Sequence, residues 1–225
     1  QRQKEADESE DMEWNAYAEI YEPREAVELA AVPAAPLRFE TRPLEGKVDP
    51  ATAGLLVLDA DGDGRPDLAA WSRAGLKLYR NGTAPLGGGP WPAGIASVAA
   101  GDYDNDGLAD LCVVGEAGPA LFRNAGGKFE NAKVSLPAGR YRKALWLDFD
   151  HDYDLDLLLF GAKSVVVRNE GAAGFRAVEF PFVAGEAIDA AAFRLVPDSK
   201  GFDFLASYRD RGGVLYRDLL GGRYE

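Results

Sequence analysis

Three short segments of the chain each carry four aspartates at the same spacing, a pattern typical of cation binding. Each follows the form Asp-x-Asp-x-Asp-Gly-x-x-Asp, except that Tyr153 replaces the glycine in the third. Alternate side chains of a tightly curled loop can converge on one point, where their carboxylates repel one another unless a cation neutralises them. The predicted side-chain ligands are Asp59, Asp61, Asp63, Asp67, Asp102, Asp104, Asp106, Asp110, Asp148, Asp150, Asp152 and Asp156.

The seventh residue of each loop is predicted to add a ligand through its backbone carbonyl. A flexible loop with this many hard oxygen ligands favours Ca²⁺ over Mg²⁺, which demands a stricter octahedral geometry. The sequence therefore predicts about two to three bound Ca²⁺ ions, and the third loop fits the pattern least well because of Tyr153. The predicted carbonyl ligands belong to Arg65, Leu108 and Asp154.

Two other kinds of acidic loop share part of this pattern. An EF-hand loop begins in the same way, but its twelfth position holds a bidentate Glu, where this chain has Ala70, Val113 and Leu159. The segments after the loops are also β-like runs and not amphipathic helices. Ordinary Asp-Gly turns without an ion are the second alternative, yet such turns do not require four carboxylates in register three times.

A second marker, an apolar residue followed by Arg-Asn, comes after each aspartate loop. Loop and marker recur together about every 45 residues, so the chain is a repeat protein. In a fourth repeat the loop has lost its aspartates, and Leu195, Pro197 and Ser199 stand where the first three carboxylates are expected. The four markers are Tyr79-Arg80-Asn81, Phe122-Arg123-Asn124, Val167-Arg168-Asn169 and Tyr216-Arg217-Asp218.

Each repeat contains four short apolar runs between Gly, Asn and Asp clusters, and four strands in ~45 residues is the size of a β-propeller blade. The predicted fold class is mainly β: a β-propeller of about four four-stranded blades, either a closed small ring or a fragment of a larger ring. Outer strands are expected at residues 129–136 and 175–182. Residues 37–44 resemble them, as they would if the last blade borrowed the first strand.

Residues 1–36 differ from the repeats, and the predicted domain boundary separates them from residues 37–225. The first eleven residues are mostly acidic, and apolar residues from Met12 to Val32 recur at helical spacing with an interruption at Pro23. The segment is predicted to be an acidic, helical N-terminal arm. It also resembles the end of a tetratricopeptide-like segment, of which less than one repeat is present.

The composition excludes several classes of protein. The 225 residues carry a formal net charge of −12 and no basic stretch, so nucleic acid and anionic membrane surfaces are poor partners. No apolar run is long enough for a transmembrane helix, so no membrane insertion is expected. The single cysteine, Cys112, and the single histidine, His151, exclude Cys-rich and His-rich metal cages. Cys112 is expected in the core, and His151 is expected in solvent.

In its aspartate loops, the Asp-Leu strands that follow them and the Arg-Asn turns, the chain resembles FG-GAP (VCBS-type) repeats over residues 37–225. Such repeats form the calcium-bearing propeller of integrin α subunits and occur in many exported bacterial proteins. The element that gives the family its name survives in part, as Phe160-Gly161-Ala162. A propeller beside a tetratricopeptide-like helix also resembles the bacterial ASPIC/UnbV-associated repeat proteins, in architecture alone. The resemblance implies structural calcium ions along one rim of the ring.

These features predict a non-enzymatic module: a calcium-binding β-propeller that mediates protein–protein or protein–glycan interaction. The sequence has no Ser/His/Asp set, phosphate-binding Gly loop or zinc motif. The alternative is a polysaccharide-active enzyme or an accessory domain of one, because a catalytic carboxylate pair could lie among the many acids. Calcium sites in exported modules have Kd values of ~10⁻⁴ to 10⁻³ M, so an extracellular or periplasmic location is expected.

Overall fold

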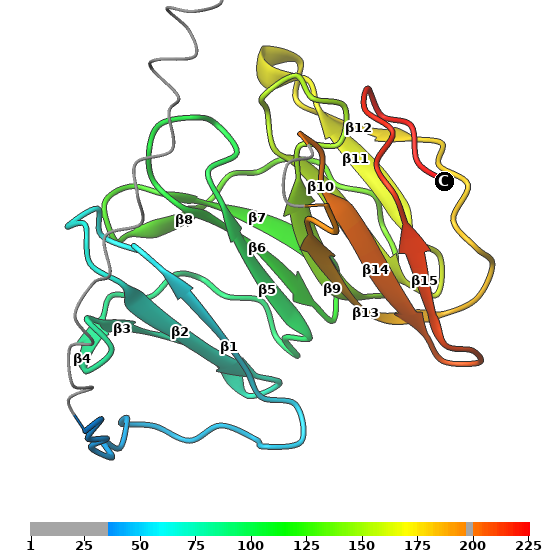
Figure 1. The fold of residues 1–225 in the computed structure, drawn as a ribbon. Coiled ribbons are helices and arrows are strands. Elements are labelled where there is room, and N and C mark those ends of the chain that lie inside the picture. The colour runs from blue at the N-terminus through cyan, green and yellow to red at the C-terminus, as the bar shows by residue number, and fades with distance from the viewer. Residues whose placement is uncertain (1–35, 197–199) are drawn as a thin grey trace, which may run out of the picture. The chain divides into compact units, whose positions relative to one another are not determined.

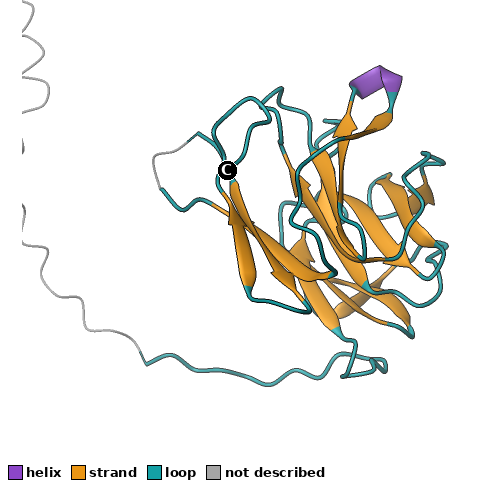
Figure 2. Cartoon of the chain, turned by 90° about the vertical axis from the view of Figure 1, so that its right-hand side faces the viewer, coloured by secondary structure: helices purple, strands orange, loops and turns teal. Residues whose placement is uncertain are grey.

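The computed structural model describes residues 36–196 and 200–225. The chain divides into two compact units, residues 1–41 and residues 42–225. Residues 1–35, and with them nearly all of the predicted helical arm, lie outside the described residues. The described part of the second unit consists of strands and loops with one short 3-10 helix at Gly171–Ala173 (Figure 2). Among the described residues, no helix has the length and apolarity needed to cross a membrane.

The described strands form four antiparallel sheets, or blades, and within each blade the strands pair in chain order. This arrangement confirms the prediction of a mainly β, four-bladed propeller. Blade 1 contains β1 (Gly54–Leu58), β2 (Asp67–Ser72), β3 (Gly75–Arg80) and β4 (Ala84–Leu86); blade 2 contains β5 (Ser97–Gly101), β6 (Asp110–Gly115), β7 (Gly118–Asn124) and β8 (Phe129–Asn131); blade 3 contains β9 (Tyr141–Leu147), β10 (Asp156–Gly161), β11 (Val165–Asn169) and β12 (Phe175–Val178); blade 4 contains β13 (Ala187–Phe193), β14 (Asp203–Tyr208) and β15 (Gly213–Tyr216).

The first strands of the blades, β1, β5, β9 and β13, lie next to one another in that order, and the later strands extend outward from them (Figure 1). The second strands are apolar on both faces, and every residue of β10 is buried. A strand that is covered by a neighbouring blade on each side needs apolar residues at successive positions, because both of its faces are in the core.

Three apolar clusters fill the spaces between successive blades. Strand β6 shows how one strand supplies two of them. Leu111 and Val113 belong to the cluster between blades 1 and 2. Cys112 and Val114 point the other way, into the cluster between blades 2 and 3, as the two-residue period of a strand requires. Cys112 is fully buried, as expected from the sequence, and burial raises the pKa of its thiol.

The outer edges of the blades differ from the expectation. Strands β8 and β12 are shorter than the predicted 129–136 and 175–182. After β8 the chain leaves the extended conformation at Lys133, whose φ is +54°. After β12, Phe180 and Phe182 leave the sheet and pack against Phe204 of blade 4, with ring centroids 6.0 and 6.3 Å away. Apolar residues there fill the core between the blades and do not continue the strand.

Blade 4 has three strands. The sequence suggested that residues 37–44 could add a fourth, outer strand to this blade. Residues 37–44 contain no strand. The alignment of the fourth repeat also needs a correction of one residue. Phe193 pairs with Asp203 in blade 4, which makes Arg194 the first loop residue and Leu195 the second.

In blades 1 to 3, the pairing register of the first two strands brings the two ends of each aspartate loop together. The last aspartate of each loop is paired directly with the residue that precedes the first aspartate, so the two ends of the loop motif meet. The pairs are Leu58 with Asp67, Gly101 with Asp110, and Leu147 with Asp156.

Candidate metal centres

The three aspartate loops join the first and second strands of blades 1, 2 and 3, and each brings three carboxylates together. In each loop, one oxygen from each of positions 1, 3 and 9 lies within 4.8 Å of the others. Oxygen ligands of this kind suit a hard cation. The three sets are Asp59, Asp61 and Asp67; Asp102, Asp104 and Asp110; and Asp148, Asp150 and Asp156.

The first aspartate curls the loop by accepting hydrogen bonds from backbone N–H groups farther along. Asp59 Oδ1 accepts from Gly62 at 2.8 Å, and Asp59 Oδ2 accepts from Gly64 at 2.8 Å. Asp102 and Asp148 make corresponding bonds in the other two loops. The curl requires a left-handed backbone at positions 4 and 6, where Gly62 and Gly64 have φ values of +76° and +78°.

The third loop keeps this curl without either glycine. His151 at position 4 and Tyr153 at position 6 have φ values of +65° and +74°. His tolerates the left-handed region better than most residues, whereas a bulky Tyr there is strained. The Tyr153 side chain is 89% exposed, so it gains little packing in return. The third loop thus forms at a conformational cost that the first two avoid.

The ninth aspartate ties the loop to the third strand of its blade. Asp67 is 1% exposed, and its two oxygens accept N–H bonds from Ala60 at 2.9 Å and from Asn81 at 2.7 Å. Asp110 and Asp156 are also buried and accept the same pair of bonds. A buried carboxylate with two backbone donors is well held, so the position-9 oxygens are fixed before any ion binds.

Blade 4 separates the structural role of the position-9 aspartate from metal binding: its loop is one residue longer, and Asp203 takes the equivalent place at the start of the second strand. Its Asp203 accepts N–H bonds from Leu195 and Asp218, each at 2.9 Å, as Asp67 does in blade 1. Among the described residues of this blade there is no close set of three carboxylates. The position-9 aspartate therefore supports the fold of a blade even where the rest of the loop motif is missing.

The electrostatics of the loops favour a cation. Burial raises the pKa of Asp110 to about 6 and that of Asp156 to about 7, against the lowering effect of their backbone hydrogen bonds. Repulsion from neighbouring loop aspartates raises both pKa values further. Without a cation these two carboxylates hold a proton well above the pH at which aspartate ordinarily loses it.

An arginine from the third strand reaches back to position 3 of each loop, and it is the arginine of the Arg-Asn marker. Arg80 Nε lies 2.6 Å from Asp61 Oδ2, and Arg123 Nε lies 2.6 Å from Asp104 Oδ2. Arg168 Nη2 lies 2.5 Å from Asp150 Oδ2. The other oxygen, Asp150 Oδ1, is buried and has no hydrogen-bond partner among the described residues. This oxygen of the third site is therefore available to coordinate a cation.

The carboxylates at position 5 are not part of the close sets of three. Asp63 and Asp106 each accept the N–H of the residue two positions on, at 2.9 and 3.0 Å, and Asp152 does the same at 3.0 Å. Arg65, Leu108 and Asp154 at position 7 supply these N–H groups. The ligand roles of positions 5 and 7 remain predictions. The Asp154 side chain accepts a 2.7 Å hydrogen bond from Asn105 Nδ2 of the preceding loop.

The asparagine of the marker links neighbouring blades. Asn124 Nδ2 in blade 2 donates to the carbonyl oxygen of Ala60 in the first loop, at 2.9 Å. Asn169 Nδ2 in blade 3 donates to the carbonyl oxygen of Tyr103 in the second loop, at 2.8 Å. The sequence revealed this marker through its regular spacing. It did not predict the role of the Asn side chain, because no local pattern tells which distant backbone group that side chain reaches.

His151 is not the solvated loop residue that the sequence suggested. Its side chain is 23% exposed, and its Nε2 lies 2.9 Å from Asp218 Oδ2 in blade 4. Asp218 stands where the first three markers have Asn. Blades 3 and 4 are thus joined through a side-chain pair at the place where the other blades are joined through Asn and a carbonyl group.

The comparisons with known proteins agree with this geometry. The sequence profile of a family described as FG-GAP-like repeat matches residues 59–113 and 102–159. No curated protein matches the sequence.

Two solved structures share the fold. One is of an Agrocybe aegerita lectin that specifically recognises non-reducing terminal N-acetylglucosamine; it matches with TM-score 0.55 and 22% identity over 77% of this chain and 51% of that chain. Another, BBS1N in complex with ARL6DN and soaked with lead, matches with TM-score 0.52 and 16% identity over 76% of this chain and 54% of that chain. The chain spans about half the length of these structures.

Proposed function

Because this chain carries FG-GAP-like repeats in a four-bladed β-propeller, we propose that it is a calcium-stabilised binding module for a protein or glycan partner. The observation that carries the proposal is the threefold recurrence of converging carboxylates at positions 1, 3 and 9. An ordinary surface turn does not need three acids that converge on one point, because bringing like charges together without a cation costs free energy.

Calcium is the cation that fits these sites best. The ligand atoms are all oxygens, and the loops offer further carboxylate and carbonyl oxygens. A ligand set of this size favours Ca²⁺ over the smaller Mg²⁺. The aspartates at positions 1, 3, 5 and 9 and the backbone carbonyl at position 7 would hold the ion. A bound Ca²⁺ would supply positive charge that neutralises the loop and locks its curl. Two to three ions are proposed, since Tyr153 strains the third loop.

A binding role is favoured over catalysis by how the loop acids are used. The position-1 and position-9 carboxylates accept backbone hydrogen bonds, and the position-3 carboxylates pair with Arg80, Arg123 and Arg168. Such groups are committed to holding the loops in shape. The lectin among the structural neighbours supports recognition of a glycan or a protein as the role of the fold.

We place the protein outside the cytoplasm, in the periplasm or the extracellular medium. Loops of this kind in exported modules bind Ca²⁺ with Kd values of ~10⁻⁴ to 10⁻³ M, and calcium is supplied at such concentrations outside the cell. The net charge of −12 fits this proposal, because bound Ca²⁺ would offset part of it.

Calorimetric titration of the metal-stripped protein with Ca²⁺ and with Mg²⁺ tests the proposal, with melting curves at each endpoint. We expect two to three Ca²⁺ per chain, a higher melting temperature with Ca²⁺ and little response to Mg²⁺. Absence of Ca²⁺ binding, or an equal response to both ions, would contradict the calcium assignment. Turnover of an oligosaccharide by the calcium-loaded protein would contradict the binding-module assignment.

A further inference from the structure

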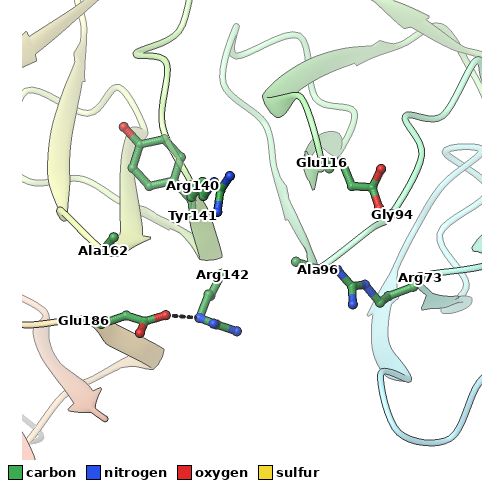
Figure 3. Close-up of a pocket in the computed structure, with 10 residues that line it drawn as sticks. Arg73, Gly94, Ala96, Glu116, Arg140, Tyr141, Arg142, Ala162 and Glu186 are labelled. Atoms are coloured by element: carbon green, nitrogen blue, oxygen red, sulfur yellow. Dashed lines mark hydrogen bonds and ion pairs between the residues drawn. The ribbon is translucent and has the colours of Figure 1, made fainter. Parts of the chain in front are cut away.

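A cavity of about 610 Å³ lies at the end of the blades opposite the aspartate loops. Loops between first and second strands gather at one end of antiparallel blades, so the turns between second and third strands gather at the other. The cavity is lined by such turns and by residues that lead into the first strands. The charged and aromatic residues around it are Arg73, Glu116, Arg140, Tyr141, Arg142 and Glu186. Figure 3 shows Arg73 and Glu116 on one side, with Arg140, Tyr141 and Arg142 facing them.

Three arginines and two glutamates line this cavity, so its lining is slightly positive in a chain whose net charge is −12. Three arginines from blades 1 and 3 line it, and a neighbouring cavity of about 390 Å³ also touches Arg73 and Arg142. Among the described residues, Arg142 has one ion-pair partner, Glu186. The Oε1 atom of Glu186 lies 2.5 Å from Arg142 Nε. Glu186 is shared with Arg209, at 2.6 Å, so one carboxylate serves two guanidinium groups.

Two of the arginines are left without a counter-ion. Within the described residues, neither the Arg73 nor the Arg140 side chain has a hydrogen bond or ion pair, although both line the cavity. A guanidinium group binds a carboxylate through two parallel N–H bonds, and this is the ligand that best satisfies it. Both side chains are exposed as well as unpaired, so a ligand that carries carboxylates can reach them from solvent and form such bonds.

The same cavity also offers groups that suit hydroxyls and a sugar ring. Glu116 has no ion-pair partner in the described part of the chain, and its carboxylate can accept hydrogen bonds from hydroxyl groups. Glu116 packs over Gly94, where an added Cβ would lie 2.2 Å from Glu116 Cγ, so the glycine is required for its position. Tyr141 is half-buried and contributes an aromatic face and a phenol. A volume of 300–1,000 Å³ is typical of small-ligand sites.

We propose that this arginine cavity binds an acidic oligosaccharide, in which sugar carboxylates pair with Arg73 and Arg140 and sugar hydroxyls bind Glu116 and Tyr141. An acidic peptide would satisfy the arginines but would bring further carboxylates toward Glu116, whereas a uronic acid combines one carboxylate with several hydroxyl donors. The inference depends on the proposed function as a binding module and names the ligand class for one of its faces.

The probe is a tetrasaccharide that contains glucuronic acid, compared with the same tetrasaccharide after its carboxylates are reduced to alcohols. Binding to the full chain is measured by calorimetry at a fixed Ca²⁺ concentration. We expect the acidic sugar to bind and the reduced sugar to bind at least tenfold more weakly. Arg73→Gln and Arg140→Gln should each weaken binding of the acidic sugar about tenfold, which corresponds to about 1.4 kcal/mol. Each substitution removes a charge-assisted pair between a guanidinium group and a sugar carboxylate.

Arg176→Gln is the matched control, since it removes one positive charge from the exposed outer strand β12, where Arg176 pairs with Glu170. Equal affinity of the acidic and reduced sugars, or equal weakening by Arg176→Gln, would overturn the proposal. Tighter binding of a poly-glutamate peptide than of the acidic sugar would also overturn it in favour of a protein ligand. If the sugar fails to bind while Ca²⁺ still raises the melting temperature, the arginine cavity assignment alone is wrong; if the Ca²⁺ response is also absent, the proposed function is wrong.

Discussion

Asn169 of blade 3 donates a hydrogen bond from Nδ2 to the carbonyl oxygen of Tyr103 in blade 2, over 2.8 Å. Tyr103 is the second residue of the blade 2 aspartate loop, and its N–H donates to Asp110, the ninth. The peptide groups on the two sides of Tyr103 therefore serve different purposes: one closes the loop and the other docks the next blade. An ordered loop and an ordered interface between blades are physically coupled at this residue.

Asn169→Ala should destabilise the protein by about 1–3 kcal/mol, because it leaves the partly buried carbonyl of Tyr103 without its donor. The unfolding midpoint in urea, measured with saturating Ca²⁺, checks the loss. Asn81→Gly is the matched control: Asn81 is exposed and has a φ of +49°, so glycine removes the side chain without straining the backbone. An equal loss in the two variants would mean that the link between blades contributes nothing to stability.

Asp61→Ala should remove one bound Ca²⁺ and that ion's share of stability. At tenfold to hundredfold excess of Ca²⁺ over Kd, this share is about 1.4–2.7 kcal/mol. Calorimetric stoichiometry and the Ca²⁺-induced change in unfolding free energy measure it. Asp210→Ala, a surface aspartate outside the loops, should leave both unchanged.

Asp203→Ala in blade 4 should destabilise the protein to the same extent with and without Ca²⁺. It removes the acceptor for the partly buried N–H groups of Leu195 and Asp218, which we expect to cost about 1–3 kcal/mol in total. Because no close set of carboxylates surrounds Asp203 among the described residues, this cost should be the same with and without Ca²⁺. A loss that appears only with Ca²⁺ would place an ion in blade 4.

Tyr153→Gly should stabilise the protein by about 0.5–1 kcal/mol. The substitution relieves a left-handed residue at φ +74° and gives up a side chain that is 89% exposed. The relief of the left-handed backbone, about 1–2 kcal/mol, exceeds the cost of the extra chain entropy of glycine, about 0.5–1 kcal/mol. Tyr153→Ala keeps the Cβ and so keeps the strain, which makes it the control in thermal melts. If Ala and Gly stabilise equally, the Tyr side chain itself is unfavourable and the backbone is not strained.

The metal-free protein should lose stability as the pH rises from about 4 to about 7. Burial raises the pKa of Asp156 to about 7, above its ordinary value of 3.8, so over this range the folded chain holds a proton that the unfolded chain has released. Bound Ca²⁺ displaces this proton, so Ca²⁺ affinity should fall as the pH is lowered below 7. Urea midpoints of metal-stripped protein at several pH values check the first expectation, and Asp156→Asn should flatten the slope. A slope unchanged by Asp156→Asn would assign the pH dependence to other groups.

Several features of the fold follow from local sequence patterns. The aspartate loops act within nine residues, so their curl, their left-handed positions and their converging carboxylates depend on neighbours along the chain, and spacing alone predicts them. The repeat of loop and marker fixes the number of blades in the same way. The continuous apolar runs of β6 and β10 predict strands covered on both faces, because nothing polar interrupts either face.

The tertiary structure decides what distant residues do together. No local pattern indicates that Arg80 reaches back to Asp61, that Asn169 reaches Tyr103, or that Phe180 leaves its strand to pack on Phe204. The arginine cavity is the clearest case: Arg73 and Arg140 lie far apart in the sequence and line one cavity because blades 1 and 3 present the same end of their strands to it. Side-chain contacts between blades depend on how the blades pack. The residues that make these contacts have no fixed spacing along the sequence, so a sequence pattern does not reveal them.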